Sequence, residues 1–272
     1  MLAAELHTIE LDGRRFAWRS LGAGPPLVLL NGYAASAADW DPTLLDGLAR
    51  SLTLICPDNR GIGESALGVA EELSVDAMSA DVERLLDELS LTHAAVAGWS
   101  MGGYVAQHLA LRAPGRVEKL VLLATGPAGS RATPADPAVI EVLFDHSGTP
   151  REQASRLISL LFPAGVAERV DEQFGALVAE ARATLSPVTL AAQERVLGEW
   201  FSGEQPSPPA DAPPVLVLGG ELDEIAPPEN SRTLARLWPD ARLELFAGGG
   251  HAFIAQEPER VARLIASFAR ES

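Results

Sequence analysis

The sequence predicts an α/β protein: a mostly parallel, doubly wound sheet with an antiparallel N-terminal hairpin and a helical lid insertion. Two observations predict the sheet. Apolar runs of strand length alternate with stretches of helical periodicity, and such runs are typical of strands that helices cover on both faces. A third observation, a long segment without a strong strand pattern, predicts the insertion. We therefore expect one sheet-based core interrupted once.

Length and composition favour a single catalytic core. The 272 residues lie near the upper limit for one hydrophobic core, and 47% of them are hydrophobic while 21% are charged, as in soluble globular proteins. The formal net charge of −16 opposes binding to phosphate backbones and anionic lipid surfaces. We expect a small-molecule substrate, with neither nucleic acid nor a membrane as partner, and the oligomeric state stays open.

The sequence carries no visible targeting signal. Met1 to Glu10 lacks a basic stretch followed by a long apolar run, and the longest apolar runs, such as Leu27 to Leu30, are much shorter than the roughly 18 residues of a membrane span. These features predict a cytoplasmic protein. Cys56, the only cysteine, ends an apolar run and is expected to be a buried strand thiol.

The N-terminal region predicts an amphipathic hairpin. Thr8 to Leu11 and Arg15 to Ser20 alternate apolar and polar side chains on either side of Asp12-Gly13, a dipeptide suited to a tight turn. After this hairpin the strand candidates become short and continuously apolar, which indicates a parallel sheet. They are Leu27 to Leu30, Leu52 to Cys56, Ala94 to Ala97, Lys119 to Ala124, Val215 to Leu218 and Arg242 to Phe246.

Helical periodicity fills most of the intervals between these strands. The clearest case is Val75 to Leu89, where apolar residues recur at helical spacing and Ser74 is the expected N-cap. Further helices are predicted at Gly102 to Ala113, Pro228 to Leu237 and Glu259 to Arg270. Strand–helix–strand units with right-handed crossovers give a doubly wound sheet.

Residues 126–211 are predicted to form a helical lid, and residues 1–125 and 212–272 the core. The segment is rich in Pro, Ala, Glu and Arg, and it is bordered by Gly126-Pro127-Ala128-Gly129 and by a proline-rich stretch from Pro206 to Pro214. Such an insertion stands over the strand tips, where open α/β folds bind ligands. We therefore expect it to cover the active site.

The sharpest functional signal is Gly98-Trp99-Ser100-Met101-Gly102-Gly103, which follows a predicted strand and opens a predicted helix. A strand-to-helix turn this tight strains the backbone at the serine and requires small neighbours. The hydroxyl of Ser100 then projects alone, next to the free N–H groups of a helix N-terminus. This context predicts a nucleophilic serine.

A serine nucleophile needs a base, and the base needs an acid that fixes its tautomer. His251 is the expected base, because a glycine-rich loop after the last predicted strand can bring it to the carboxyl edge of the sheet. Asp223 is the best acid, at the tip of another predicted strand, with Glu221 and Glu224 as alternatives. The remaining histidines are expected to be structural or solvated: His7, His93, His108 and His146.

Two backbone amides are candidates for holding the oxyanion of a tetrahedral intermediate. One is the N–H of Met101, just after the nucleophile, and the other is that of Tyr33, at the tip of the first buried strand. The substrate pocket is expected to involve Trp99 beside the nucleophile, Asn31 at the strand tip, and Leu161 and Phe162 in the insertion. The histidines are scattered, so no metal site and no cofactor are expected.

Several of these motifs together resemble the α/β-hydrolase family, over nearly the whole chain except the lid. They are Asn31-Gly32-Tyr33, Asp58-Asn59-Arg60-Gly61-Ile62-Gly63-Glu64-Ser65, the Ser100 turn, Gly220 to Pro227, and Gly249-Gly250-His251. The chain looks most like the lidded esterases, enol-lactonases and cofactor-free haloperoxidase-like enzymes. Asn31 stands where the family often has histidine, and Ile62 replaces a histidine between two glycines.

The resemblance and the residues together imply a serine hydrolase that cleaves an ester, thioester or lactone of a small, mainly apolar substrate through an acyl-serine intermediate. Carbon–carbon bond hydrolysis and perhydrolysis on the same triad remain alternatives. A third alternative, from a different class, is a receptor-like protein that keeps the fold and binds a ligand without catalysis.

Overall fold

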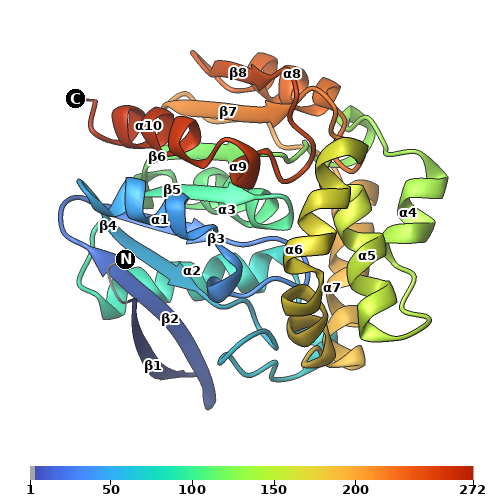
Figure 1. Cartoon of the computed structure of the whole chain (residues 1–272). Coiled ribbons are helices and arrows are strands. Elements are labelled where there is room, and N and C mark those ends of the chain that lie inside the picture. Colours follow the sequence, from blue (N-terminus) through green and yellow to red (C-terminus); the bar gives the residue numbers. More distant parts are fainter. Residues whose placement is uncertain (1–3, 272) are drawn as a thin grey trace.

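The computed structural model describes residues 4–271 and contains the predicted doubly wound sheet (Figure 1). The described residues exclude Met1 to Ala3 and Ser272. Met1 to Ala3 are part of the N-terminal stretch in which a targeting signal was sought. Within them the strand order is β1-β2-β4-β3-β5-β6-β7-β8. β1 (Glu5–Leu11) and β2 (Arg14–Gly22) form the antiparallel hairpin, and β2 is also antiparallel to β4 (Thr53–Pro57).

All other strand neighbours are parallel, which confirms the predicted fold class. The remaining strands are β3 (Pro26–Leu30), β5 (Ala94–Trp99), β6 (Val117–Leu123), β7 (Val215–Gly220) and β8 (Arg242–Phe246).

Two local predictions from the sequence, the Asp12-Gly13 turn and the Ser74 N-cap, are confirmed in the structure. Asp12 and Gly13 have φ values of 50° and 72°, the left-handed conformation that a tight hairpin turn requires of both central residues. The Ser74 hydroxyl accepts a hydrogen bond from the Ala77 N–H (3.0 Å) and caps the following helix.

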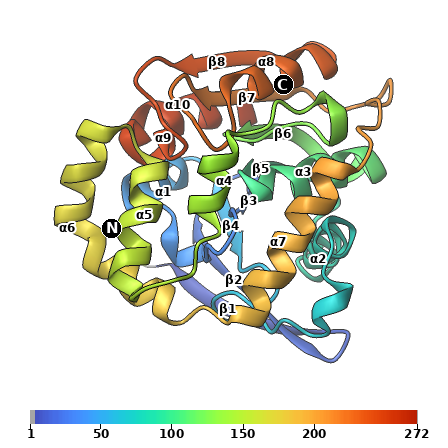
Figure 2. The ribbon, with the colours of Figure 1, turned by 90° about the vertical axis from the view of Figure 1, so that its right-hand side faces the viewer.

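Helices cover both faces of the sheet (Figures 1 and 2). One face is packed by α1 (Pro42–Ala49), α9 (Phe253–Gln256) and α10 (Pro258–Ala269), and the other by α2 (Val75–Glu88), α3 (Met101–Arg112) and α8 (Pro228–Leu237). Successive residues of a central strand serve opposite faces, as strand geometry dictates.

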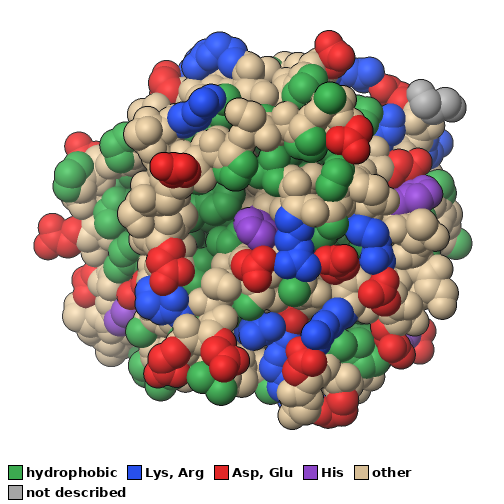
Figure 3. All heavy atoms as spheres, turned by 180° about the vertical axis from the view of Figure 1, so that it is seen from behind, with side chains coloured by type: hydrophobic (Ala, Val, Ile, Leu, Met, Phe, Trp, Pro, Cys, Tyr) green, Lys and Arg blue, Asp and Glu red, His purple; other side chains and the backbone are tan. Residues whose placement is uncertain are grey.

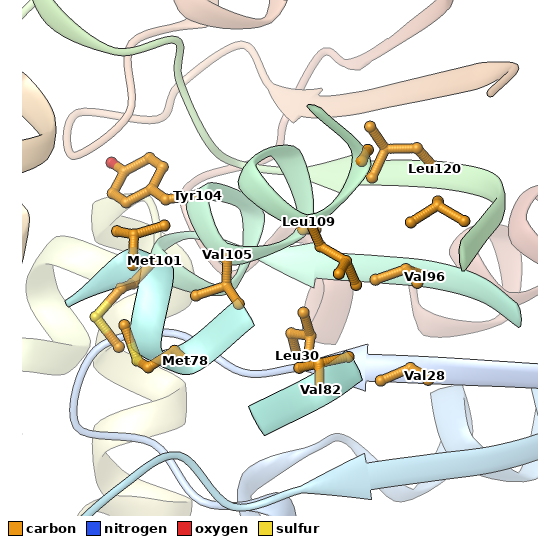
Figure 4. Packing of buried hydrophobic residues seen from close by; sticks show 14 of the residues in the cluster. Val28, Leu30, Met78, Val82, Val96, Met101, Tyr104, Val105, Leu109 and Leu120 are labelled. Carbon is orange, nitrogen blue, oxygen red and sulfur yellow. The ribbon is translucent and has the colours of Figure 1, made fainter. Parts of the chain in front are cut away.

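The core behind the active-site edge illustrates this alternation. Val28 and Leu30 of β3 pack against α2 and α3, as Figure 4 shows, whereas Leu27 and Leu29 belong to the cluster on the other face. All four side chains are fully buried or nearly so. Such two-sided burial explains why the strands are continuously apolar in the sequence.

The segment between β6 and β7 contains four α-helices in the described structure, and Figure 1 places them on one side of the molecule, beyond the ends of the central strands. They are α4 (Pro137–Leu143), α5 (Pro150–Leu161), α6 (Ala164–Ala183) and α7 (Pro187–Ser202). α7 also packs into the core: Val196 and Trp200 are buried there, and the Trp200 ring stacks on Tyr104 of α3 with ring centroids 4.8 Å apart.

The back of the molecule carries hydrophobic side chains gathered around a hollow, among charged side chains of both signs (Figure 3). A hollow of about 430 Å³ lies between α2, α3 and α7, and Val75, His108 and Trp200 are among its lining residues. None of the helices within residues 4–271 is both long and apolar enough to cross a bilayer.

The N-terminus of α3 lies very close to the end of β3. A Cβ atom at Gly102 would lie 2.1 Å from the Leu30 carbonyl oxygen, and one at Gly98 would lie 2.2 Å from the Gly102 carbonyl oxygen. Only glycine at both positions lets β3, β5 and α3 meet at this distance.

We predict that Gly102→Ala lowers the free energy of unfolding by about 3 kcal/mol or prevents folding, because the added methyl must displace backbone atoms. Urea denaturation measures the loss. Gly198→Ala in α7 is the matched control, since a Cβ there meets nothing within 4 Å; alanine should stabilise that helix by about 1 kcal/mol. Equal stability of the wild type and Gly102→Ala would contradict this packing.

Candidate active site

Ser100 stands at the turn between β5 and α3, in a conformation that non-glycine residues rarely adopt (φ 55°, ψ −120°). Three hydrogen bonds hold its backbone. Its N–H donates to the Leu123 carbonyl (2.9 Å), and its own carbonyl accepts from the Gly103 N–H (2.9 Å) and the Thr125 hydroxyl (2.8 Å). The side chain is partly exposed, so a substrate can reach it.

His251 and Asp223 form a buried pair. His251 Nδ1 lies 2.9 Å and 3.1 Å from the two carboxylate oxygens of Asp223, and the two residues are 3% and 4% exposed. Because an ionised carboxylate only accepts, Nδ1 donates this hydrogen bond, and in the neutral imidazole the lone pair is then on Nε2. The N–H groups of Ile225 and Ala226 also donate to Asp223 (2.9 and 2.8 Å).

The acid alternatives differ in burial. Glu221 and Glu224 are exposed, whereas Asp223 is enclosed beside the imidazole. The geometry therefore favours Asp223 over both glutamates as the partner of His251.

The structure links His251 to the nucleophile turn through Trp99. The Trp99 indole N–H donates to the His251 carbonyl (3.0 Å), and the two rings pack with centroids 5.3 Å apart. No hydrogen bond among residues 4–271 joins the Ser100 hydroxyl to His251. Such contacts are often long in the absence of substrate, so the relay between these two residues stays a prediction.

The loop after β3 brings Gly32, the residue before the predicted oxyanion amide of Tyr33, close to the candidate nucleophile Ser100. A Cβ on Gly32 would lie 3.2 Å from the Ser100 Cβ, so glycine permits this approach. In the described part of the chain neither the Tyr33 N–H nor the Met101 N–H donates a hydrogen bond. Two free donors beside Ser100 are what an oxyanion requires.

Both polar atoms of the Asn31 side chain form hydrogen bonds within this loop, so they stabilise the loop and are not free to bind a substrate. Its side-chain oxygen accepts from the Gly32 N–H (3.0 Å), and its amide nitrogen donates to the Ser36 carbonyl (2.6 Å). The Asn59 amide donates in turn to the Asn31 carbonyl (3.1 Å). The Asp58–Ser65 loop thus supports the loop after β3 through this hydrogen bond.

Two residues of α7, which the sequence did not single out, hold the same loop from the other side. Gln193 is fully buried and accepts from the Ala34 N–H (2.8 Å), and Ala34 has a left-handed φ of 56°. Glu194 accepts from the Tyr33 hydroxyl (2.7 Å) and lies 2.6 Å from His146. Burial, and then Glu194, raise the pKa of Tyr33.

The corner between α5 and α6 touches the loop of the candidate base. The Ala252 N–H donates to the Leu161 carbonyl (2.9 Å), and a Cβ at Gly250 would lie 2.8 Å from that oxygen and 3.3 Å from the Phe162 Cα. Leu161 and Phe162, predicted for the pocket, therefore lie next to His251 through their backbone. Their side chains are partly buried.

The cysteine and two of the other histidine side chains are either buried or engaged with residues away from Ser100. Cys56 is buried in β4, and burial, with the nearby Asp58, raises the pKa of its thiol to about 12. His7 stacks on Trp18, and His108 bonds to Ser79 (3.0 Å). Among residues 4–271 no three His, Cys, Asp or Glu side chains converge as metal ligands.

Comparison with known proteins decides the family. The family model of the α/β-hydrolase fold matches residues 25–258, most of the chain and all of the elements that position Ser100, Asp223 and His251. The chain belongs to the α/β-hydrolase family. Asn31 and Ile62 are thus departures within an α/β hydrolase rather than signs of another fold.

Two relatives of this α/β hydrolase are named as ester-cleaving enzymes. It is 31% identical to an sn-1-specific diacylglycerol lipase of Xenopus laevis over 90% of this chain and 80% of the relative. It is 28% identical to a pimeloyl-[acyl-carrier protein] methyl ester esterase of Vibrio vulnificus, covering 93% and 97%. A solved α/β-hydrolase-fold protein from Chitinophaga pinensis matches with a TM-score of 0.84 and 25% identity, covering 100% and 99%.

A solved enol-lactonase from Burkholderia xenovorans matches with a TM-score of 0.81 and 21% identity, covering 97% of this chain and 100% of the other, which is a likeness of fold. The predicted resemblance to lidded hydrolases is confirmed at the level of the family.

We predict that Gln193→Leu in this α/β hydrolase lowers kcat by roughly a hundredfold with little change in KM, because the Tyr33 amide shifts when Ala34 loses its partner. Steady-state ester hydrolysis measures both constants. Gln205→Leu is the matched control: Gln205 also accepts from a backbone N–H, that of Ala128 (2.6 Å), at the border of the insertion. Equal kinetics for the two variants would show that Gln193 does not position the loop.

Proposed function

We propose that this α/β hydrolase is a serine hydrolase that cleaves an ester, thioester or lactone of a small, mainly apolar substrate through an acyl-Ser100 intermediate. The observation that carries the proposal is the strained Ser100 turn, with free N–H groups at Tyr33 and Met101 and with Trp99 packed against His251 of the buried Asp223–His251 pair. The names of the relatives, a lipase and methyl ester esterases, support ester bonds as the class of target.

In the first half-reaction the Ser100 oxygen attacks the carbonyl carbon while His251 Nε2 takes the hydroxyl proton. The carbonyl π electrons move to oxygen, and the Tyr33 and Met101 N–H groups donate to that oxyanion. Collapse of the intermediate breaks the carbon–oxygen or carbon–sulfur bond, and the leaving alcohol or thiol takes the proton from His251. Ser100 then carries the acyl group.

In the second half-reaction water replaces the alcohol. His251 takes a proton from the water, whose oxygen attacks the acyl carbon, and the same proton returns to the Ser100 oxygen as the acid departs. Asp223 acts through the imidazole: its carboxylate fixes the proton on Nδ1 and stabilises the imidazolium that forms twice in each cycle. Residues 126–211 would act as a lid that limits access of water.

We predict that an alkyl fluorophosphonate labels the wild-type protein once and that Ser100→Ala abolishes both labelling and hydrolysis of short esters, with a loss of about 10⁴-fold or more. Intact-mass spectrometry and a chromogenic ester assay give the two readouts. Ser202→Ala, at the exposed end of α7, is the control and should keep both.

A panel of short esters, lactones and ring-fission diketones, assayed with water and with added peroxide, separates the reactions that the same triad could perform. We expect esters or lactones to react fastest. Turnover of a diketone with negligible ester hydrolysis would favour carbon–carbon cleavage, and an unlabelled, inactive wild-type protein would favour ligand binding without catalysis.

A further inference from the structure

Arg182, in the last turn of α6, is a partly buried cation without an anionic partner. Its Nε atom is buried and has no hydrogen-bond partner among residues 4–271. The chain has 37 acidic against 21 basic residues, and many of its arginines form ion pairs, as Arg60 does with Asp81 and Arg151 with Asp171. The guanidinium of Arg182 is therefore unpaired in spite of an excess of carboxylates.

The groups around Arg182 increase its electrostatic cost. Burial lowers the pKa of Arg182, the positive charge of Arg156 on α5 lowers it further, and only the phenol of Tyr33 opposes these effects. Arg156 itself is held by Asp145, with its Nε 3.3 Å from the carboxylate. The carbonyl end of the α6 dipole offsets part of the cost, but a desolvated guanidinium gains most from a bidentate anion.

Glu194 of α7, the carboxylate that contacts the Tyr33 side chain, already has two partners. Glu194 accepts from the Tyr33 hydroxyl (2.7 Å) and lies 2.6 Å from His146. Beside the same loop, Gln193 accepts from Ala34 through its oxygen, while its Nε2 is buried without a partner in the described structure. Arg182 of α6 and Gln193 of α7 thus bring buried N–H donors that lack acceptors to the neighbourhood of residues 33 and 34.

The geometry points to a carboxylate-binding subsite at Arg182, so that the preferred substrate is an ester or lactone that carries a free carboxylate remote from the scissile carbonyl. This inference rests on the proposed hydrolysis at Ser100, because Tyr33 both neighbours Arg182 and supplies an oxyanion amide. Arginine suits the task because its planar donors match the two oxygens of a carboxylate. The rest of the substrate can still be apolar.

The test compares monomethyl esters of unbranched dicarboxylic acids with methyl esters of monocarboxylic acids of the same chain lengths. The wild type should prefer the half-ester at one or two chain lengths. Arg182→Met should raise KM for that half-ester by about tenfold or more and leave the constants for neutral esters unchanged. Arg182→Lys keeps the charge but not the planar donor pair, so its KM for the half-ester should lie between those of the wild type and Arg182→Met.

Arg169→Met is the matched control, since Arg169 is an exposed arginine on the same helix. It should behave as the wild type with both substrate series. No preference for half-esters at any chain length, or equal losses on charged and neutral esters in Arg182→Met, would overturn the subsite.

If the wild type hydrolyses neither series, the proposed function fails, and calorimetric titration of Ser100→Ala with the half-esters still decides the subsite. Binding that disappears when Arg182→Met is added supports it. Absence of binding, or binding that persists in the double variant, overturns it.

Discussion

The close approach of β3, β5 and α3 is the constraint on which the site depends. Gly98 and Gly102 let the chain pass from strand to helix beside Leu30, and the passage forces Ser100 into a left-handed conformation. Three backbone hydrogen bonds hold that strain in place. The same geometry exposes the hydroxyl, directs the N-terminus of α3 toward it and brings the Tyr33 loop alongside.

The insertion does more than cover this edge of the sheet. α7 packs in the core through Val196 and Trp200 and holds the Tyr33 loop through Gln193 and Glu194, whereas the α5–α6 corner contacts the His251 loop through the Leu161 carbonyl. Segments far apart in the sequence therefore set the positions of the candidate base and of the candidate oxyanion donor Tyr33. A movement of α5 and α6 relative to the core would change the contact between Leu161 and the His251 loop.

Much of the fold could be predicted because its signals are local. Period-two and continuous apolar runs located the strands, and β8 and α8 have the predicted bounds. The Ser100 turn and the His251 loop stood out because glycine and strand context mark them. α1 was missed, although Asp41 caps it and Pro42 opens it, a signal that the sequence does contain.

The supports of the site could not be predicted in this way. Gln193 and Glu194 contact residues 159 and 161 positions away, and no periodicity reports such pairs. The unpaired state of Arg182 likewise depends on which carboxylates the fold brings near it, which composition alone does not reveal. The position of Asp223 in the sequence ranked it above Glu221 and Glu224, and its burial and its contact with His251 distinguish it from them in the structure.

The most direct measurement is a crystal structure of the protein with Ser100 carrying a phosphonate that imitates the tetrahedral intermediate. The account predicts the phosphonyl oxygen within about 3 Å of the Tyr33 and Met101 amide nitrogens, and His251 Nε2 within about 3 Å of the Ser100 oxygen. A phosphonate bound at Ser100 with its oxygen away from both amides, or an imidazole out of reach of that serine, would contradict it.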